Sequence, residues 1–95
     1  MPGYVVVNTI VSDPEQYARY RELAGQAVER HGGRYLARGG EMSVLEGDWQ
    51  PERLVILEFD SLEAAQAWYE SEEYAAARDA RAGAATMHMV AVAGA

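Results

Sequence analysis

Four polar side chains interrupt segments that otherwise read as apolar strands. Asn8 stands in a run of β-branched residues near the start of the chain, and His88 stands in the last apolar run. Arg38 and Glu58 lie near the ends of two segments that we expect to be antiparallel neighbours in a sheet. Side chains alternate along a strand, so Arg34 and Arg38 should share one face of the second strand, and Arg38 can meet Glu58 there. The pattern predicts one cavity lined by an amide, a guanidinium, a carboxylate and an imidazole.

Such a cavity would bind a small carboxylate or an enolisable carbonyl compound and move a proton. In this interpretation Arg38 holds the anion and Asn8 orients the ligand. Glu58 or His88 then acts as the base. A structural interpretation stays open for each residue. Arg38 and Glu58 could form an ion pair that closes the end of the sheet. His88 could be a hydrogen-bonded core or interface residue, and Asn8 could cap an irregular ladder.

A second group of residues, in the C-terminal half, combines aromatic rings with an arginine. Trp68 precedes Tyr74, and Arg78 follows Tyr74 by one helical turn. These rings would form a pocket wall that stacks on a flat ligand, while Arg78 binds the carboxylate of that ligand. The alternative is packing of a helix on the sheet, with Arg78 paired to an acid such as Glu70 or Glu73. We favour packing for Trp68, and both interpretations stay open for Tyr74 and Arg78.

The composition excludes several kinds of chemistry. The chain has no cysteine, which removes disulfides, zinc–thiolate sites and a thiolate nucleophile, and it has no lysine for a Schiff base. A formal net charge of −7 argues against binding to nucleic acid or to an anionic membrane. His31 and His88 lie far apart in no ligand motif, so we predict no metal, and without a flavin or haem motif we predict no cofactor. The absence of cysteine and of a long apolar segment predicts a cytoplasmic protein.

The spacing of apolar and turn residues predicts the elements that must position these side chains. Strands are expected at residues 4–11, 34–38, 53–59 and 86–92, with a strand-like stretch at 43–47 after a bend at 39–40. A helix is expected at 14–31, with Asp13 as its N-cap and Pro14 as its first residue. A second helical region begins at 62 and restarts at 71. This order predicts an α+β, ferredoxin-like βαββαβ fold, in which two helices back a four-stranded antiparallel sheet. We expect a single domain over residues 1–95.

Two of the predicted strands are apolar on both faces. In the first strand Val6 and Ile10 face away from the valines beside them, and in the third Leu54 and Ile56 do the same. Helices cover only one face of such a sheet, so the other face needs a second cover. A second copy related by two-fold symmetry is the simplest one. The sequence therefore predicts a homodimer.

With these segments in place, the chain resembles the family of domains of unknown function called DUF1330, within the dimeric α+β-barrel superfamily. The matching stretches run in order along nearly the whole chain: GYVVVN (3–8), DPEQY (13–17), HGGRYLARGG (31–40), LEGDW (45–49), RLVILEF (53–59), AWY (67–69), SEEY (71–74) and Arg78. The resemblance implies a barrel-forming dimer of ferredoxin-like subunits and no established activity. The superfamily includes cofactor-independent monooxygenases, muconolactone-type isomerases and haem-containing dye-decolourising enzymes.

Two functions follow as hypotheses from these observations. The first is binding of a small organic molecule in a cleft, with cofactor-free acid–base or oxygenation chemistry. In that case Arg38 or Arg78 would hold the anion. The second is a non-catalytic dimer that senses or sequesters a metabolite or binds another protein. The sequence leaves open whether the protein is an enzyme.

Overall fold

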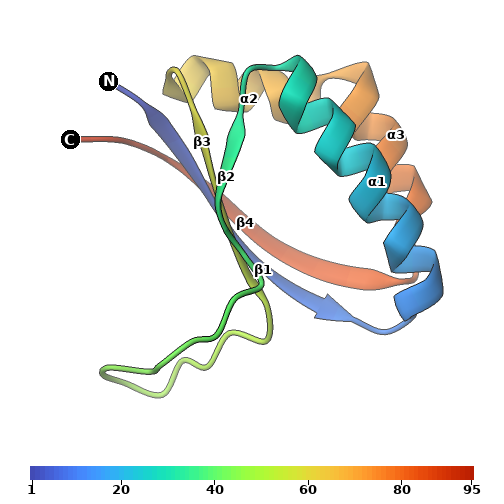
Figure 1. Cartoon of the computed structure of the whole chain (residues 1–95), viewed down its shortest axis with the longest axis vertical. Coiled ribbons are helices and arrows are strands. Elements are labelled where there is room, and N and C mark those ends of the chain that lie inside the picture. Colours follow the sequence, from blue (N-terminus) through green and yellow to red (C-terminus); the bar gives the residue numbers. More distant parts are fainter.

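A four-stranded antiparallel sheet packs against three helices in the computed structural model, which describes all 95 residues (Figure 1). The elements are, in chain order, β1 (Gly3–Val11), α1 (Pro14–Arg30), β2 (Arg34–Arg38), β3 (Leu54–Phe59), α2 (Leu62–Glu70), α3 (Glu72–Ala80) and β4 (Ala85–Ala93). The strand order is β2-β3-β1-β4, with every neighbouring pair antiparallel. The predicted ferredoxin-like α+β fold is confirmed.

Short polar residues set the ends of the helices. The Asp13 side chain accepts a hydrogen bond from the Gln16 backbone N–H at 3.2 Å, and Pro14 takes the first helical position of α1. Ser71 ends α2 with an extended backbone, and its Oγ accepts from the Tyr74 N–H at 3.1 Å to begin α3. The predicted restart at residue 71 is confirmed, and three helices rather than two back the sheet. No helix combines the length and apolarity needed to cross a membrane.

The hydrophobic core lies between the helices and one face of the sheet, called here the inner face (Figure 1). Alternate residues of the two central strands point into it, and Leu57 and Phe59 of β3 are at most 3 % exposed. The helices contribute large aromatic side chains, among them Tyr20, Trp68 and Tyr74. This core places several phenol hydroxyls and one indole in the interior.

The opposite, outer face of the sheet carries no helix (Figure 1). Val6 and Ile56 are half-buried at its centre. Around them Val90 is 63 %, Val92 is 49 % and Ile10 is 41 % exposed. The prediction that both faces of the sheet are apolar is confirmed, and the chain by itself leaves the outer face uncovered.

A β-bulge in β2 changes which side chains face the helices. Arg34 lies opposite Glu58, and a regular ladder would then place Arg38 opposite Leu54; instead Arg38 lies opposite Val55. The extra residue reverses the alternation of side chains beyond the bulge. Arg34 therefore faces outward, whereas Arg38 faces the core. The prediction that these two arginines share one face is wrong.

Residues 39–53 connect β2 to β3 without regular secondary structure and extend away from the sheet (Figure 1). The strand-like stretch predicted at 43–47 is therefore wrong: no other strand of the chain pairs with it. The side chains of this loop do not fold back onto the core, since Leu45 is 94 % and Trp49 is 61 % exposed. We call this segment the β2–β3 loop.

Candidate functional site

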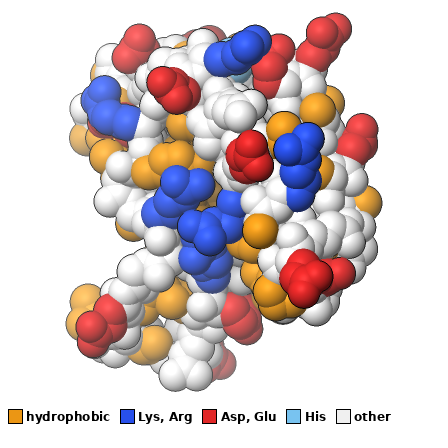
Figure 2. All heavy atoms as spheres, turned by 45° about the vertical axis from the view of Figure 1, so that its right-hand side comes forward, with side chains coloured by type: hydrophobic (Ala, Val, Ile, Leu, Met, Phe, Trp, Pro, Cys, Tyr) orange, Lys and Arg blue, Asp and Glu red, His pale blue; other side chains and the backbone are white.

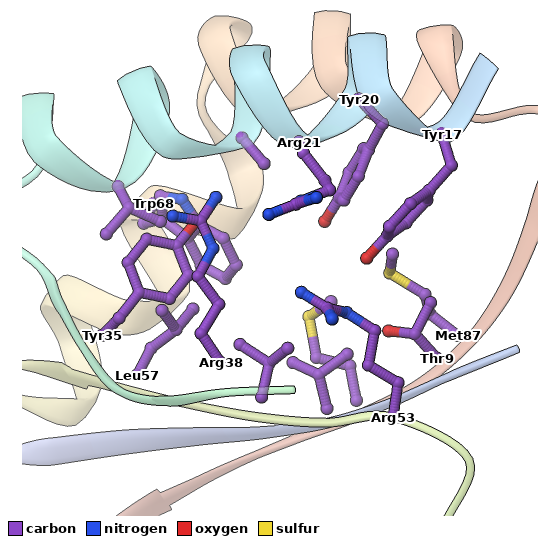
Figure 3. Close-up of a pocket in the computed structure, with 15 residues that line it drawn as sticks. Thr9, Tyr17, Tyr20, Arg21, Tyr35, Arg38, Arg53, Leu57, Trp68 and Met87 are labelled. Atoms are coloured by element: carbon purple, nitrogen blue, oxygen red, sulfur yellow. The ribbon is translucent and has the colours of Figure 1, made fainter. Parts of the chain in front are cut away.

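A small cleft lies between α1 and the inner face of the sheet (Figure 3). Its volume is about 30 Å³, enough for one or two water molecules by the criterion of roughly 10–15 Å³ for each. Its floor is apolar and its polar groups are arginines, tyrosines and one threonine. The polar lining comprises Thr9, Tyr17, Tyr20, Arg21, Tyr35, Arg38 and Arg53, and the rest includes Val7, Val55, Leu57, Trp68, Met87 and Met89.

Three arginines converge on this cleft from three separate elements. Arg21 descends from α1, while Arg38 at the end of β2 and Arg53 just before β3 rise from the sheet (Figure 3). No aspartate or glutamate lines the cleft, and none of the three arginines belongs to an ion pair of the chain. Figure 2 shows basic side chains gathered in the middle of one face, with acidic ones scattered around them. A chain of net charge −7 thus concentrates uncompensated positive charge at one point.

Tyrosine rings pack against the guanidinium groups of two of these arginines. The guanidinium carbon of Arg38 lies 4.1 Å from the centre of the Tyr35 ring, and that of Arg53 lies 6.0 Å from the Tyr17 ring. Such cation–π contacts hold a guanidinium in place without neutralising it. Both cations therefore stay available to an anionic ligand.

Two phenols of the cleft, those of Tyr20 and Tyr35, are proton donors rather than bases. Burial raises the pKa of Tyr20 and of Tyr35 above the ordinary value of 10.0. The Tyr20 hydroxyl is also hydrogen-bonded to the Tyr74 hydroxyl at 2.9 Å. These phenols remain protonated at neutral pH and can donate hydrogen bonds to an anion.

Besides the indole Nε1 of Trp68, two further polar atoms of residues that line the cleft have no hydrogen-bond partner in the chain. Thr9 is 1 % exposed, and its hydroxyl oxygen contacts no donor or acceptor. The same is true of the buried Nε of Arg53. Buried polar atoms are nearly always satisfied in folded proteins, so these two mark a place where a polar ligand or water would bind.

The predicted Arg38–Glu58 pair does not form. Glu58 is paired with Arg34, its direct neighbour on β2, on the outer face. Arg38 lies on the other side of the sheet because of the bulge. The structural alternative, an Arg38–Glu58 ion pair that closes the end of the sheet, is wrong for the same reason, since Glu58 pairs with Arg34.

Asn8 and His88 also lie on the outer face, opposite each other in the β1–β4 register. The Asn8 side-chain oxygen accepts hydrogen bonds from the backbone N–H groups of Glu52, at 3.1 Å, and Arg53, at 3.5 Å. Asn8 therefore anchors the end of the β2–β3 loop, and His88 is exposed. The chain does not bring Arg38 into one cavity with Asn8, Glu58 and His88. The roles of Asn8, Glu58 and His88 in acid–base chemistry stay predictions.

The second predicted group is mainly part of the core. Trp68 is 2 % exposed, and its ring centre lies 4.3 Å from that of Tyr74, which is fully buried; Trp68 also lines the cleft. Arg78 lies 4.7 Å from the Tyr69 ring centre and donates a hydrogen bond to the Tyr69 hydroxyl at 3.4 Å. The suggested pairing of Arg78 with an acid is wrong, since Arg78 belongs to none of the ion pairs of the chain.

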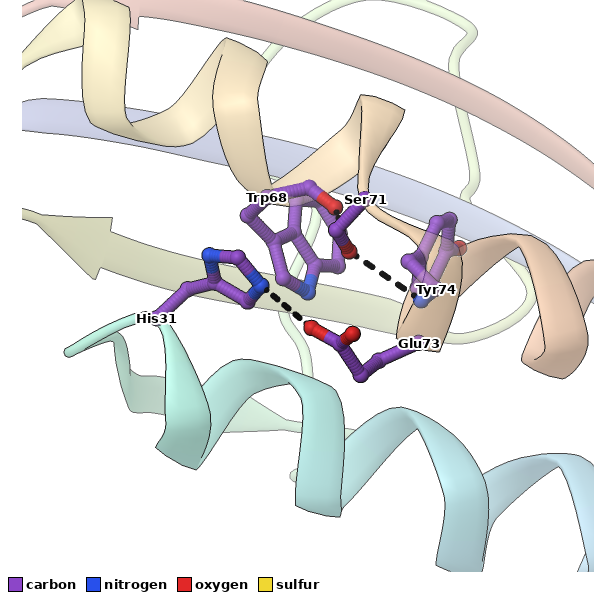
Figure 4. A network of polar contacts seen from close by, with 5 residues as sticks. All are labelled: His31, Trp68, Ser71, Glu73 and Tyr74. Atoms are coloured by element: carbon purple, nitrogen blue, oxygen red, sulfur yellow. Dashed lines mark hydrogen bonds and ion pairs between the residues drawn. The ribbon is translucent and has the colours of Figure 1, made fainter.

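Glu73, one of those acids, instead contacts His31 at the end of α1 (Figure 4). The His31 Nε2 and a Glu73 carboxylate oxygen are 2.8 Å apart, and this contact ties α1 to the first turn of α3. The hydrogen bond from His31 lowers the pKa of Glu73. This pair lies away from the cleft and has a structural role.

Sequence reasoning missed most of the cleft. Tyr17 and Tyr20 were recognisable as members of the apolar stripe of the first helix, but their hydroxyl groups were not assigned a role. Arg21 and Arg53 carried no signal of their own, because an arginine next to a buried residue is common on protein surfaces. Only packing of α1 over the sheet brings residues 21, 38 and 53 together.

The fold and this cleft define a ferredoxin-like α+β protein with a basic, aromatic pocket between its helices and its sheet. The chain belongs to the family described as Domain of unknown function (DUF1330), whose family model matches residues 2–95. The resemblance inferred from the sequence is thus confirmed. No match was found among curated proteins.

Solved structures share the fold. A protein of unknown function from Rhodopseudomonas palustris is 22 % identical, with a TM-score of 0.73, over 99 % of this chain and 82 % of that one. A dimeric ferredoxin-like protein of unknown function from Thermobifida fusca is 17 % identical, with a TM-score of 0.67, over 99 % and 92 %. SnoaB, a cofactor-independent oxygenase from Streptomyces nogalater, is 9 % identical, with a TM-score of 0.65, over 99 % and 93 %. At these identities the likeness shows the fold alone.

Proposed function

We propose that this protein binds a small, flat organic anion, with a carboxylate as its charged group, in the cleft between α1 and the sheet. One observation carries the proposal: Arg21, Arg38 and Arg53 converge on the cleft, and no acidic side chain of the chain compensates them. An arginine binds a carboxylate through two parallel hydrogen bonds, which a planar anion matches well.

The remainder of the cleft suits the rest of such a ligand. The Thr9 hydroxyl and the protonated Tyr20 phenol supply further donors at its edge. Val55 and Leu57 form an apolar floor, and Met89 adds a side chain that adapts to the shape of a ring. The cleft is small without a ligand, so the arginine side chains at its edge would move outward when one binds.

The chemistry of the cleft favours binding over acid–base catalysis. It contains no aspartate, glutamate or histidine, and the phenols of Tyr20 and Tyr35 hold their protons. Glu58 and His88, the predicted bases, would act only on a ligand at the outer face. Non-catalytic sensing or sequestration of a metabolite is therefore the form of the proposal that the geometry supports best. The cofactor-independent oxygenase among the structural neighbours is the reason to test turnover with oxygen as well.

We also propose that the outer face is covered by a second copy of the chain. The neighbour from Thermobifida fusca and another from Bacteroides fragilis are both described as dimeric. The exposed apolar side chains of Ile10, Val90 and Val92 supply the surface that such a copy would bury. Trp49, exposed on the β2–β3 loop, would then contact the second copy.

Calorimetric titration with benzoate and with its neutral analogue benzamide tests the anion site. We expect benzoate to bind more tightly than benzamide, and R38A to weaken benzoate binding by roughly 10- to 100-fold, the effect of losing a charge-assisted hydrogen bond of about 1.5–3 kcal/mol. R19A is the matched control, because Arg19 pairs with Glu22 on the exposed side of α1. Equal binding of the two probes, or equal effects of R38A and R19A, would refute the proposal.

A further inference from the structure

We infer that Gly39 is a positioning residue for this cleft: the absence of a side chain at residue 39 is what allows the Arg53 guanidinium to reach the ligand site. The inference rests on the proposed anion binding. It adds a structural requirement for the position of the Arg53 guanidinium, one of the three cations of the cleft. Gly39 follows Arg38 directly, at the start of the β2–β3 loop, and Arg53 stands at the end of that loop.

The contact between Gly39 and Arg53 leaves no room for a methyl group. A Cβ built on Gly39 would overlap Nη1 of Arg53 and would lie 2.7 Å from its Cζ and 3.2 Å from its Nη2. The guanidinium therefore packs directly over the backbone of Gly39. Gly39 also has a φ of +71°, which residues with a side chain rarely adopt.

The backbone on both sides of this contact is tied to the sheet. The Gly39 N–H donates to the Leu54 carbonyl at 2.9 Å, and the Thr9 N–H donates to the Arg53 carbonyl at 2.9 Å. The side chain of Arg53 is thus the part that must yield if residue 39 gains a methyl group. Its Nε is buried with no partner in the chain, so no hydrogen bond holds that atom in place. The guanidinium would move out of the cleft, away from the Tyr17 ring.

Gly32 provides a matched control for the strain of the backbone. It has the same φ of +71°, but a Cβ placed on it would meet nothing within 4 Å. G32A and G39A therefore both place an alanine at the same unfavourable φ, and only G39A also brings a methyl group against Arg53. A difference between the two variants reports the contact with Arg53.

The test is the dissociation constant for benzoate and for benzamide in wild type, G32A, G39A, R53A and the double variant G39A/R53A. We expect G39A to weaken benzoate binding by about tenfold or more, as loss of a charge-assisted hydrogen bond does, with little effect on benzamide. G32A should bind both probes as wild type does. In the R53A background G39A should cause no further loss, because its effect passes through Arg53.

Crystal structures of G39A and G32A give a readout that needs no ligand. We expect the Arg53 guanidinium outside the cleft in G39A and inside it in G32A. If Arg53 keeps its place in G39A, or if G39A binds benzoate as well as G32A does, the inference is overturned and the anion site stands. If wild type binds no benzoate, the proposed function fails, while a displaced Arg53 in G39A would still support the positioning role.

Discussion

Arg34 and Glu58 form an ion pair on the outer face of the sheet, at directly opposed positions of β2 and β3. The Glu58 side chain is 14 % exposed and that of Arg34 is 65 % exposed, so the carboxylate is the buried partner. Tyr4 of β1 is the neighbour of Glu58 on its other side. Removing Arg34 would leave a largely buried carboxylate without its counter-ion, which costs more than the pair itself contributes.

We expect R34A to lower the free energy of unfolding by about 1–3 kcal/mol, the usual cost of leaving a buried polar group unsatisfied. Urea unfolding at a fixed protein concentration measures this, with R19A as the control for an exposed pair worth about 0–1 kcal/mol. The double variant R34A/E58Q should recover part of the loss, since the amide carries no charge. Equal values for R34A and R19A would show that Glu58 does not depend on Arg34.

The buried hydrogen bond between Tyr20 and Tyr74 should make their contributions to stability non-additive. Their hydroxyl oxygens are 2.9 Å apart, and the two residues are 7 % and 0 % exposed. Y20F or Y74F leaves one buried hydroxyl unpaired, at a cost of about 1–3 kcal/mol, whereas the double variant leaves none. We expect the double variant to lose clearly less stability than the sum of the single variants. A double-mutant cycle by urea unfolding measures this, and strict additivity would contradict it.

Stability should fall above pH 10 because of the same two phenols. Burial raises the pKa of both, so the folded protein keeps protons that the unfolded chain releases above its ordinary pKa of 10.0. The unfolded state then binds fewer protons, and the free energy of unfolding decreases by up to about 1.4 kcal/mol per pH unit for each phenol. Below pH 10 both states are protonated and the effect disappears. Between pH 8 and 11 the free energy of unfolding should fall less steeply with pH for Y20F than for wild type. Equal slopes for the two proteins would contradict this.

A charge at Val90 should separate the proposed dimer. Val90 lies opposite Val6 at the centre of the apolar outer face and is 63 % exposed in the single chain. A glutamate there would be buried without a partner when a second copy binds. We expect V90E to sediment as a monomer of 10.4 kDa and wild type as a dimer, with Q26E on the exposed side of α1 as the control. A V90E dimer as stable as wild type would mean that another surface joins the two copies.

Local signals in the sequence predicted most of the fold. The Asp13-Pro14 pair predicted the start of α1, and Ser71 predicted the break between α2 and α3, because capping depends on residues within one turn. The alternation of apolar residues predicted which strands are central and why the outer face needs a cover. Residues 43–47 were predicted wrongly, since β-branched and apolar residues alone do not make a strand without a neighbour to pair with.

The candidate site could be predicted only in part. Arg38 was identified as an anion-binding residue and lies in the cleft, but its predicted partner Glu58 lies on the other face. The error came from a single position, the bulge in β2. No residue type in that strand indicates a bulge. Trp68 was expected to pack and does so, while forming part of the cleft wall.

The sequence by itself determined the order of the elements, the ferredoxin-like sheet, the membership of the DUF1330 family and the apolar character of both sheet faces. These properties depend on neighbouring residues and on periodic patterns. The tertiary structure decided where the charges go. A strand has a period of two, so one extra residue in β2 moved Arg38 from the outer face to the inner one. Packing of α1 on the sheet then brought Arg21 and Arg53 to the same cleft, a meeting of distant residues that no local pattern encodes.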